Sequence, residues 1–203
     1  MIWVPSKQAT RREVEKALQR AYPTKVIDEL HVSILDSDLP SDRLRDLFNS
    51  IASTPQSKAV FEVDVGKAHV VHVGYEGVPD WEELNREFTS RERFVAIAES
   101  GGGILYWNIL LSRIAPFWAG YWNFFQVKND EVCPEIVAED TGDVWTHVTF
   151  SVRSTLASYG LHEVSQALLD SPVTWLHPEP NSKPAGSTTH RLTVYDAIFS
   201  EVY

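Results

Sequence analysis

Histidine and cysteine are the first residues to consider for metal-binding or nucleophilic chemistry in this sequence. Of the seven histidines, His69 and His72 are the closest pair, and they lie in a segment of strand composition. Side chains three positions apart on a strand point to opposite faces, so we do not expect these two to share a metal ion. The only cysteine, Cys133, lies between Glu131 and Glu135, whose negative charges disfavour a reactive thiolate.

Local catalytic motifs are absent from the sequence. There is no nucleophile elbow of the Gly-x-Ser-x-Gly type, no phosphate-binding glycine loop and no dinucleotide fingerprint. Glu62, Asp64 and Glu76 could form an acid/base pair with a carboxylate from a distant element, but a solvated strand face and a loop account for them more simply. We therefore expect a protein that is not an enzyme and that needs no cofactor or metal.

Acidic residues are concentrated in the segment 129–143, which contains no lysine or arginine. Their spacing does not match the calcium-binding loop of an EF-hand. The segment is then either a solvated, turn-rich connection or a surface that attracts a basic protein. For the second interpretation the candidate partner-binding acids are Glu131, Glu135, Glu139, Asp140 and Asp143.

Aromatic residues are concentrated just before this acidic segment, in "RIAPFWAGYWNFF" at 113–125. The longest uncharged apolar run, 104–111, is too short to cross a bilayer, which takes roughly 20 residues. If 120–127 is a strand, rings lie on both of its faces. We predict that one face belongs to the core, and we take Trp118, Tyr121 and Trp122 as candidate anchors for a partner.

Composition limits the classes of partner. The chain has 203 residues and a formal net charge of −10, which disfavours binding to nucleic acid or to an anionic membrane and favours a basic protein. A lone cysteine excludes an intramolecular disulfide, and the charged N-terminal segment does not resemble a secretion signal. We expect a cytoplasmic protein with a single domain over 1–203.

The pattern of apolar residues predicts an α+β domain with a largely antiparallel sheet and helices packed on one face. Two segments have the stripe of amphipathic helices, and two others alternate like the strands of a hairpin. The expected helices are 10–22, 41–54, 80–100 and 161–171. The expected strands are 30–35, 59–66, 68–75, 120–127 and 143–154, with 190–199 as a strand or a strand entering a short helix.

Three segments, "PFWAGYWNFF", "WTHVTFSV" and "RLTVYDAIFSEVY", together with the acidic charge, give the chain a resemblance to bacterial immunity proteins. These proteins neutralise toxins of polymorphic and type VI secretion systems, and the most similar family is immunity protein fifty-two. The resemblance covers mainly 104–203. It implies stoichiometric binding of a cognate toxin, of the DNase type, by occluding its active site or its dimerisation. It supplies no catalytic residues and leaves a homodimer open.

One alternative from a different class remains. The aromatic stretch could line a pocket for a small ligand or substrate, with carboxylates as acid/base groups. A concave pocket beside this stretch would favour the alternative, and complete packing of the rings would argue against it.

Overall fold

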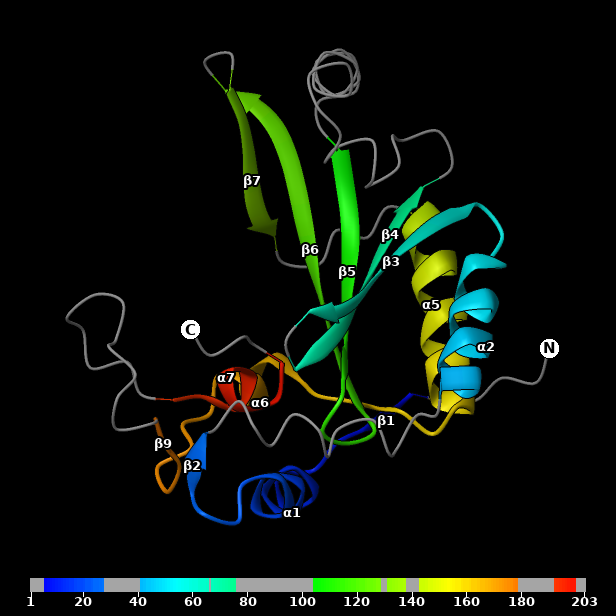
Figure 1. Cartoon of the computed structure of the whole chain (residues 1–203). Helices are drawn as coiled ribbons and strands as arrows, with labels where there is room; N and C mark the ends of the chain where they lie inside the picture. The colour runs from blue at the N-terminus through cyan, green and yellow to red at the C-terminus, as the bar shows by residue number, and fades with distance from the viewer. Residues whose placement is uncertain are drawn as a thin grey trace.

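A computed structural model of the chain describes residues 6–27, 41–65, 67–75, 104–128, 131–137, 143–178 and 192–199. Figure 1 shows the order of its elements along the chain. These are β1 (Lys7–Gln8), α1 (Arg11–Ala21), β2 (Val26–Ile27), α2 (Ser41–Ala52), β3 (Ser57–Val65), β4 (Ala68–Tyr75), β5 (Ile104–Ser112), β6 (Phe117–Lys128), β7 (Glu131–Val137), α5 (Asp143–Ser158), β8 (His162–Glu163), α6 (Gln166–Leu169), β9 (His177–Pro178) and α7 (Val194–Ile198).

A mixed sheet runs through the molecule in the strand order β1-β8-β6-β5-β4-β3, and β7 pairs with the far end of β6. The long strands β3, β4, β5, β6 and β7 pair antiparallel with their neighbours. Among the described strands, only the short β1 and β8 add parallel pairs to this sheet, and β2 and β9 form a separate parallel pair. The α+β class and the largely antiparallel sheet are thus confirmed.

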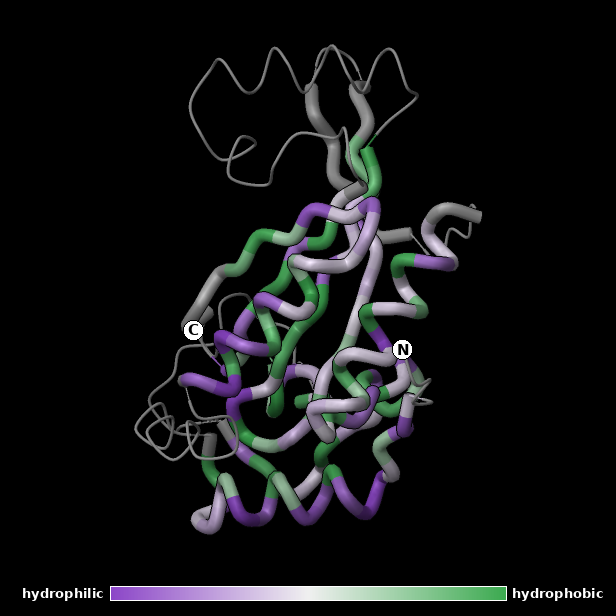
Figure 2. Tube along the Cα trace, turned by 90° about the vertical axis from the view of Figure 1, so that its right-hand side faces the viewer, coloured by the Kyte–Doolittle hydropathy of each residue, from purple (hydrophilic) through white to green (hydrophobic). Residues whose placement is uncertain are grey.

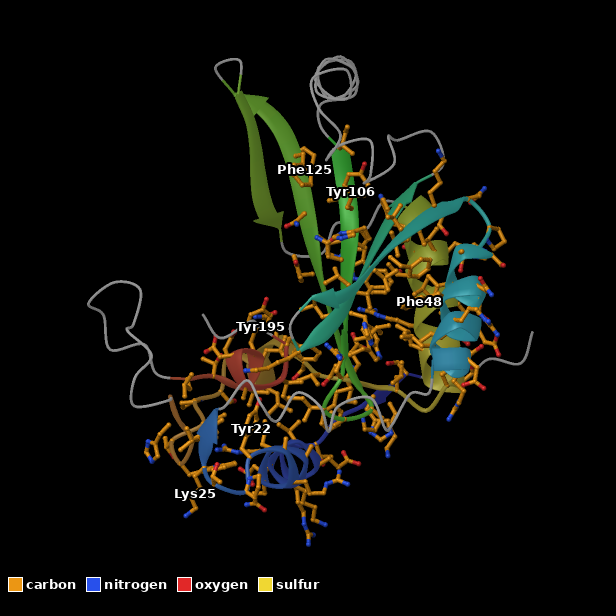
Figure 3. All side chains as sticks on the ribbon, viewed as in Figure 1. Tyr22, Lys25, Phe48, Tyr106, Phe125 and Tyr195 are labelled. Carbon is orange, nitrogen blue, oxygen red and sulfur yellow. The ribbon has the colours of Figure 1, made fainter. Side chains whose placement is uncertain are left out.

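The helices α2 and α5 cover one face of the sheet, as expected. Alternate residues of β4 and β5, such as Val71 and Ile109, point to this face and have no exposed surface. They pack against Leu47 and Ile51 of α2 and against a stripe on α5. On α2, Phe48, labelled in Figure 3, stacks on Phe61 of β3 with ring centroids 4.1 Å apart.

A second group of helices, α1, α6 and α7, covers the opposite face near one end of the sheet, which the sequence did not predict. The residues that alternate with the first set, such as Val70, Leu110 and Ala119, are buried there. They share a core cluster with Leu18 of α1 and Ile198 of α7. The sheet therefore has two apolar faces, and each has its own helices.

The helix α1 illustrates how the local sequence defines an element. Thr10 is its N-cap and forms a capping box with Glu13, which satisfies the first free N–H groups. The backbone and side chain of Thr10 hydrogen-bond the Glu13 carboxylate and lower its pKa to about 2. The buried side, with Val14 and Leu18, faces the sheet. In Figure 2 the outer turns of the corresponding tube are the hydrophilic ones.

The segment 143–154, predicted as a strand, is instead the first part of α5, so that prediction was wrong. Its residues are rich in β-branched and aromatic types, which favour strands. However, Val148, Val152 and Leu156 also lie four residues apart, and all three are fully buried. The helix is selected because this stripe completes the apolar layer with α2, and tertiary packing overrides local propensity.

Some of the other predicted elements are confirmed, and some are not. The hairpin of β3 and β4, the helices at 10–22 and 41–54 and the strand at 120–127 are confirmed. Instead of one helix at 161–171 there are β8 and the single-turn α6, and 190–199 contains the short helix α7. The acidic connection contains β7 rather than only turns. The expected strand 30–35 and helix 80–100 lie outside the described residues.

Candidate functional site

The aromatic stretch belongs mainly to the core on its tryptophan side. Trp118 and Trp122 of β6 are 1% and 7% exposed and face α2 and α5. Trp107 of β5 stacks on Trp122 at 5.8 Å and meets Trp118 edge-on at 6.0 Å, and Trp145 of α5 meets Trp122 edge-on at 4.9 Å. This burial argues against Trp118 and Trp122 as anchors for a partner, because such rings offer it little surface.

Tyr121 lies on the opposite face of β6, and it is half-buried. Asn123 and Phe125 follow on the same face, and the ring of Phe125 meets Tyr106 edge-on at 6.0 Å. Figure 3 shows these last two side chains at the end of the sheet away from α1. Of the three aromatic candidates, Tyr121 is the one that stands outside the tryptophan core.

The acidic candidates do not all come from one loop. Glu131 and Glu135 lie in β7, where Glu131 pairs with Lys128 and Glu135 with Phe124 in the backbone register. Asp143 is the first residue of α5. Glu139 and Asp140 lie outside the described residues. The sequence could not show that the acidic segment forms the second strand of a hairpin with β6, because its Pro and Asp content resembles that of a turn.

The outer edge of β6 is shared by two different strands. At one end, the N–H groups of His162 and Val164 donate to the carbonyls of Pro116 and Trp118, each at 2.8 Å. At the other end, the residues from Trp122 onward pair with β7. In the described part of the chain no strand pairs with this edge at 119–121. The gap is therefore three residues long, about 10 Å at the rise of a strand.

Gly120 lies at the centre of this gap. Backbone N–H and C=O groups alternate between the two edges of a strand, and the carbonyls of Pro116 and Trp118 point to the outer edge. The N–H and C=O of Gly120 therefore point outward as well. Among the described residues no strand or turn supplies a backbone partner for them. With respect to this part of the chain, Gly120 presents an adjacent donor and acceptor at the gap.

A cavity of about 640 Å³ opens at the same place, between β6 and the short helices α6 and α7. Its walls combine aliphatic, aromatic and polar side chains with the strand edge. The described residues that line it are Leu110, Ala119, Gly120, Tyr121, Asn123, Gln166, Leu169, Asp170, Thr193 and Tyr195.

The polar groups at the cavity are positioned by their own elements. The amide of Gln166 donates to the Asp170 carboxylate at 3.0 Å across one turn of α6. Thr193 caps α7 through a capping box with Asp196, which places Tyr195 in the first turn of this helix. Partial desolvation of the residue, which is 37% exposed, and the nearby charge of Asp196 raise the pKa of Tyr195, so its phenol remains a hydrogen-bond donor at neutral pH. The Thr-x-x-Asp spacing of this box was a signal that sequence analysis missed.

A buried lysine holds α7 in place. Lys67, between β3 and β4, is 5% exposed, and its ammonium group donates to the carbonyl of Asp196 at 2.9 Å. The same group lies 5.8 Å from the ring centroid of Tyr22, whose hydroxyl donates to the carbonyl of Ala197 at 2.8 Å. Desolvation lowers the pKa of Lys67 to about 8, partly opposed by the negative charge of Asp196. These contacts attach one wall of the cavity to the sheet and α1.

The two close histidines point to opposite faces, as expected. His69 meets Phe48 edge-on at 6.4 Å, on the side of α2. His72 lies on the other face, with Nδ1 at 2.7 Å from the amide oxygen of Asn108, the residue opposite Tyr121 in the sheet. Within the described residues, no three His, Cys, Asp or Glu side chains converge in a way that could hold a metal ion.

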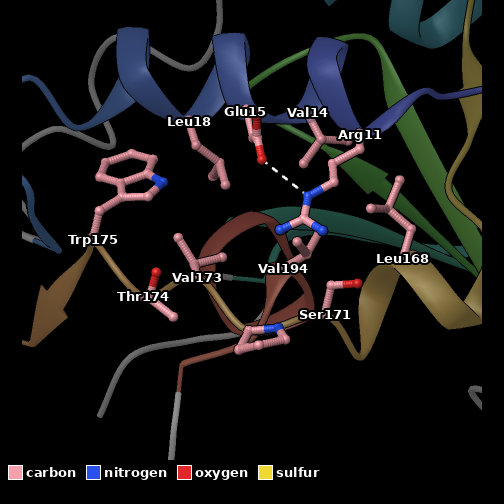
Figure 4. Close-up of a pocket in the computed structure, with 11 residues that line it drawn as sticks. Arg11, Val14, Glu15, Leu18, Leu168, Ser171, Val173, Thr174, Trp175 and Val194 are labelled. Carbon is pink, nitrogen blue, oxygen red and sulfur yellow. Dashed lines mark hydrogen bonds and ion pairs between the residues drawn. The ribbon is translucent and has the colours of Figure 1, made fainter.

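A second, smaller cavity of about 110 Å³ lies between α1 and the chain at 171–175. Figure 4 shows Arg11 at its mouth, with Nε at 3.0 Å from the Glu15 carboxylate, and Trp175 and Val173 along its side. The carboxylate of Glu15 already neutralises Arg11, and the volume admits only a few water molecules. We interpret this cavity as a packing defect between α1 and the C-terminal part of the core.

Gly120 is also required by the packing on the other face. A Cβ atom added there would lie 2.6 Å from Nε1 of Trp107. That indole cannot easily move, because it stacks on Trp122 and the Arg153 guanidinium lies 5.7 Å from its ring centroid. We expect Gly120→Ala to lower the free energy of unfolding by about 1–3 kcal/mol, measured by urea denaturation.

A double-mutant cycle with Trp107→Phe tests the cause of this effect. The smaller ring should relieve the clash, so the cost of Gly120→Ala should be smaller in the Trp107→Phe background than in the wild type. Equal costs in the two backgrounds would show that contact with Trp107 is not the reason for the glycine.

Comparison with protein-family models, with curated proteins and with solved structures finds no match for this chain. No helix among the described residues combines the length and the apolar composition that a membrane span requires. The described residues define an α+β protein with a two-sided core, a hairpin carrying acidic residues and a cavity of about 640 Å³ beside its sheet.

Proposed function

We propose that this protein is an immunity protein that binds and neutralises a cognate toxin by stoichiometric protein–protein contact. The observation that supports this most is the position of its acidic residues. Glu131 and Glu135 lie in β7, and in Figure 1 the hairpin of β6 and β7 extends beyond the labelled helices. Together with the net charge of −10, this placement suits attraction of a basic surface.

The outer strand of this hairpin, β7, is better suited to bind a partner through charged side chains than to pair with a strand of the partner. Pro134 pairs with Phe125 in the register, and odd-numbered residues of β6 direct their N–H and C=O groups toward β5. The nitrogen of Pro134 therefore faces the outer edge of β7, where it has no hydrogen to donate. A proline in this position discourages a further strand from pairing, so the toxin would contact side chains rather than extend the sheet.

The proposed toxin is a DNase-type effector of a polymorphic or type VI secretion system. Such an enzyme has a basic surface that binds the phosphate backbone of DNA. An acidic hairpin would cover that surface, or block dimerisation of the toxin, without any catalytic step. We accordingly propose that the protein acts in the cytoplasm, where the toxin would reach the chromosome.

A charge-reversal experiment tests this proposal. The probe is the product of the neighbouring gene, expressed in a sensitive host with and without this protein. The wild type should restore growth and retain the purified toxin on a column, whereas Glu131→Lys with Glu135→Lys should weaken binding by about tenfold or more, with a stronger effect at low salt.

The matched control is Glu15→Lys with Asp46→Lys, which reverses the same number of charges on exposed positions of α1 and α2. It should protect and bind like the wild type. If both double variants bind equally well, the hairpin is not the interface. If the wild type neither protects nor binds any candidate toxin, the immunity function is wrong.

A further inference from the structure

The cavity at the gap in the sheet has the size and the boundaries of a site for a small molecule. Its volume of about 640 Å³ falls in the range of roughly 300–1,000 Å³ that is usual for ligand pockets. Within the described part of the chain, the edge at 119–121 has no paired strand and is bounded at one end by β8 and at the other by β7. An extended peptide would have to continue past these strands, whereas a molecule of about 10 Å fits between them.

The open strand edge specifies part of the ligand's chemistry. The N–H and C=O groups of Gly120 are neighbouring groups on one edge, so they complement a molecule with an adjacent acceptor and donor in one plane. An amide or a nitrogen heterocycle has this pattern. The absence of a side chain on Gly120 matters on the other face, where Trp107 occupies the space, so the backbone position is fixed by the core.

The side chains around the cavity specify the other properties of the ligand, its aromatic surface, hydrogen bonding and charge. Tyr121 and Tyr195 supply aromatic surface, and Asn123, Gln166 and Thr193 supply hydrogen-bonding groups. Asp170 is the only charged residue among the described lining residues, and the protein as a whole is strongly acidic. A negatively charged ligand such as a nucleotide would be repelled by this field, but a neutral or cationic one would not.

We propose that this cavity binds a small planar nitrogen heterocycle of the nucleobase type, uncharged or cationic, whose donor–acceptor edge pairs with the backbone of Gly120. Tyr121 and Tyr195 contact the ring, and the amides of Asn123 and Gln166 bind its remaining polar groups. Tyr195 is labelled in Figure 3, where it lies on α7 beside the sheet. The proposed ligand contacts do not involve Glu131 or Glu135, and binding does not require a toxin.

Amide NMR of the full chain tests the proposal directly. The probes are adenine, cytosine and 2-aminopyrimidine, with cytidine 5′-monophosphate as the anionic comparison. A bound heterocycle should shift the amide proton of Gly120 downfield, together with the amides of Tyr121 and Tyr195. The monophosphate should bind about tenfold more weakly than cytosine or not at all.

Two variants and one control assign the site. Tyr195→Ala and Asn123→Leu should each weaken binding by about tenfold, and the amide spectrum shows whether each remains folded. Phe150→Ala removes an aromatic ring from the exposed side of α5, on the opposite face of the sheet, and should leave binding unchanged. The use of two independent variants keeps the test valid if one of them unfolds.

Three outcomes would overturn the proposal. In the first, no probe at millimolar concentration moves the Gly120 amide. In the second, a probe binds but shifts other resonances and leaves Gly120 unchanged, which would place the ligand elsewhere. In the third, the monophosphate binds as well as cytosine, which would contradict the expected preference for a neutral or cationic ligand.

Discussion

Replacing Trp118 with alanine is expected to lower the free energy of unfolding by about 3–5 kcal/mol. The indole is 1% exposed and meets Trp107 edge-on at 6.0 Å, in a cluster that also contains Val152 and Leu156 of α5. Truncation removes a large buried apolar surface and leaves a cavity that the sheet and α5 cannot close. Urea denaturation, followed by far-UV circular dichroism, measures the loss.

The matched control is Trp175→Ala, which removes the same side chain from a half-buried position beside the smaller cavity. This substitution should lower the free energy of unfolding clearly less than Trp118→Ala, because water already reaches part of the Trp175 ring. A Trp118→Ala variant with nearly wild-type stability, but with loss of toxin binding, would restore Trp118 as an interface residue and contradict the core assignment.

A rise in stability between pH 8 and pH 10 is expected from Lys67. Its pKa is about 8 in the folded protein, against 10.5 as its ordinary value. Between these two pH values the unfolded chain holds a proton that the folded protein has released, so the free energy of unfolding increases with pH. The increase from pH 7 to pH 10 should reach about 2–3 kcal/mol, at roughly 1.4 kcal/mol per pKa unit.

The comparison of Lys67→Met with the wild type isolates this effect from the ionisation of tyrosines. The methionine keeps most of the apolar stem but carries no proton, so its stability should lack the rise seen in the wild type. The exposed Lys16→Met on α1 should retain it. If Lys67→Met and the wild type change in parallel from pH 7 to pH 10, Lys67 is not desolvated as the structure indicates.

Part of the fold could be predicted because the signals were local. The apolar stripe of α1 and the hairpin pattern of β3 and β4 indicate these elements over a few residues. The opposite orientation of His69 and His72 followed from the period of a strand. In each case the deciding interactions lie within one element or one hairpin.

The wrong predictions have a common cause in competition between local and tertiary preferences. The residues of α5 have strand composition, but Val148, Val152 and Leu156 form a stripe that the layer under α2 buries. The rings of "FWAGYWNFF" indicate an apolar strand, but alternation alone cannot say which face a helix will cover. That face was decided by α2 and α5, and it placed Trp118 and Trp122 in the core and left Tyr121 beside the cavity.

The sequence by itself determined the acidic charge, the absence of local catalytic motifs, the hairpin of β3 and β4 and the amphipathic helices, because each depends on composition or on neighbouring residues. Only the tertiary structure decided that β7 and β8 share the edge of β6 and that no other described strand pairs with it at Gly120. The cavity there joins residues from β5, β6, α6 and α7. Such a site has no local pattern, because its residues meet only when strands distant in the chain pair and the short helices pack beside them.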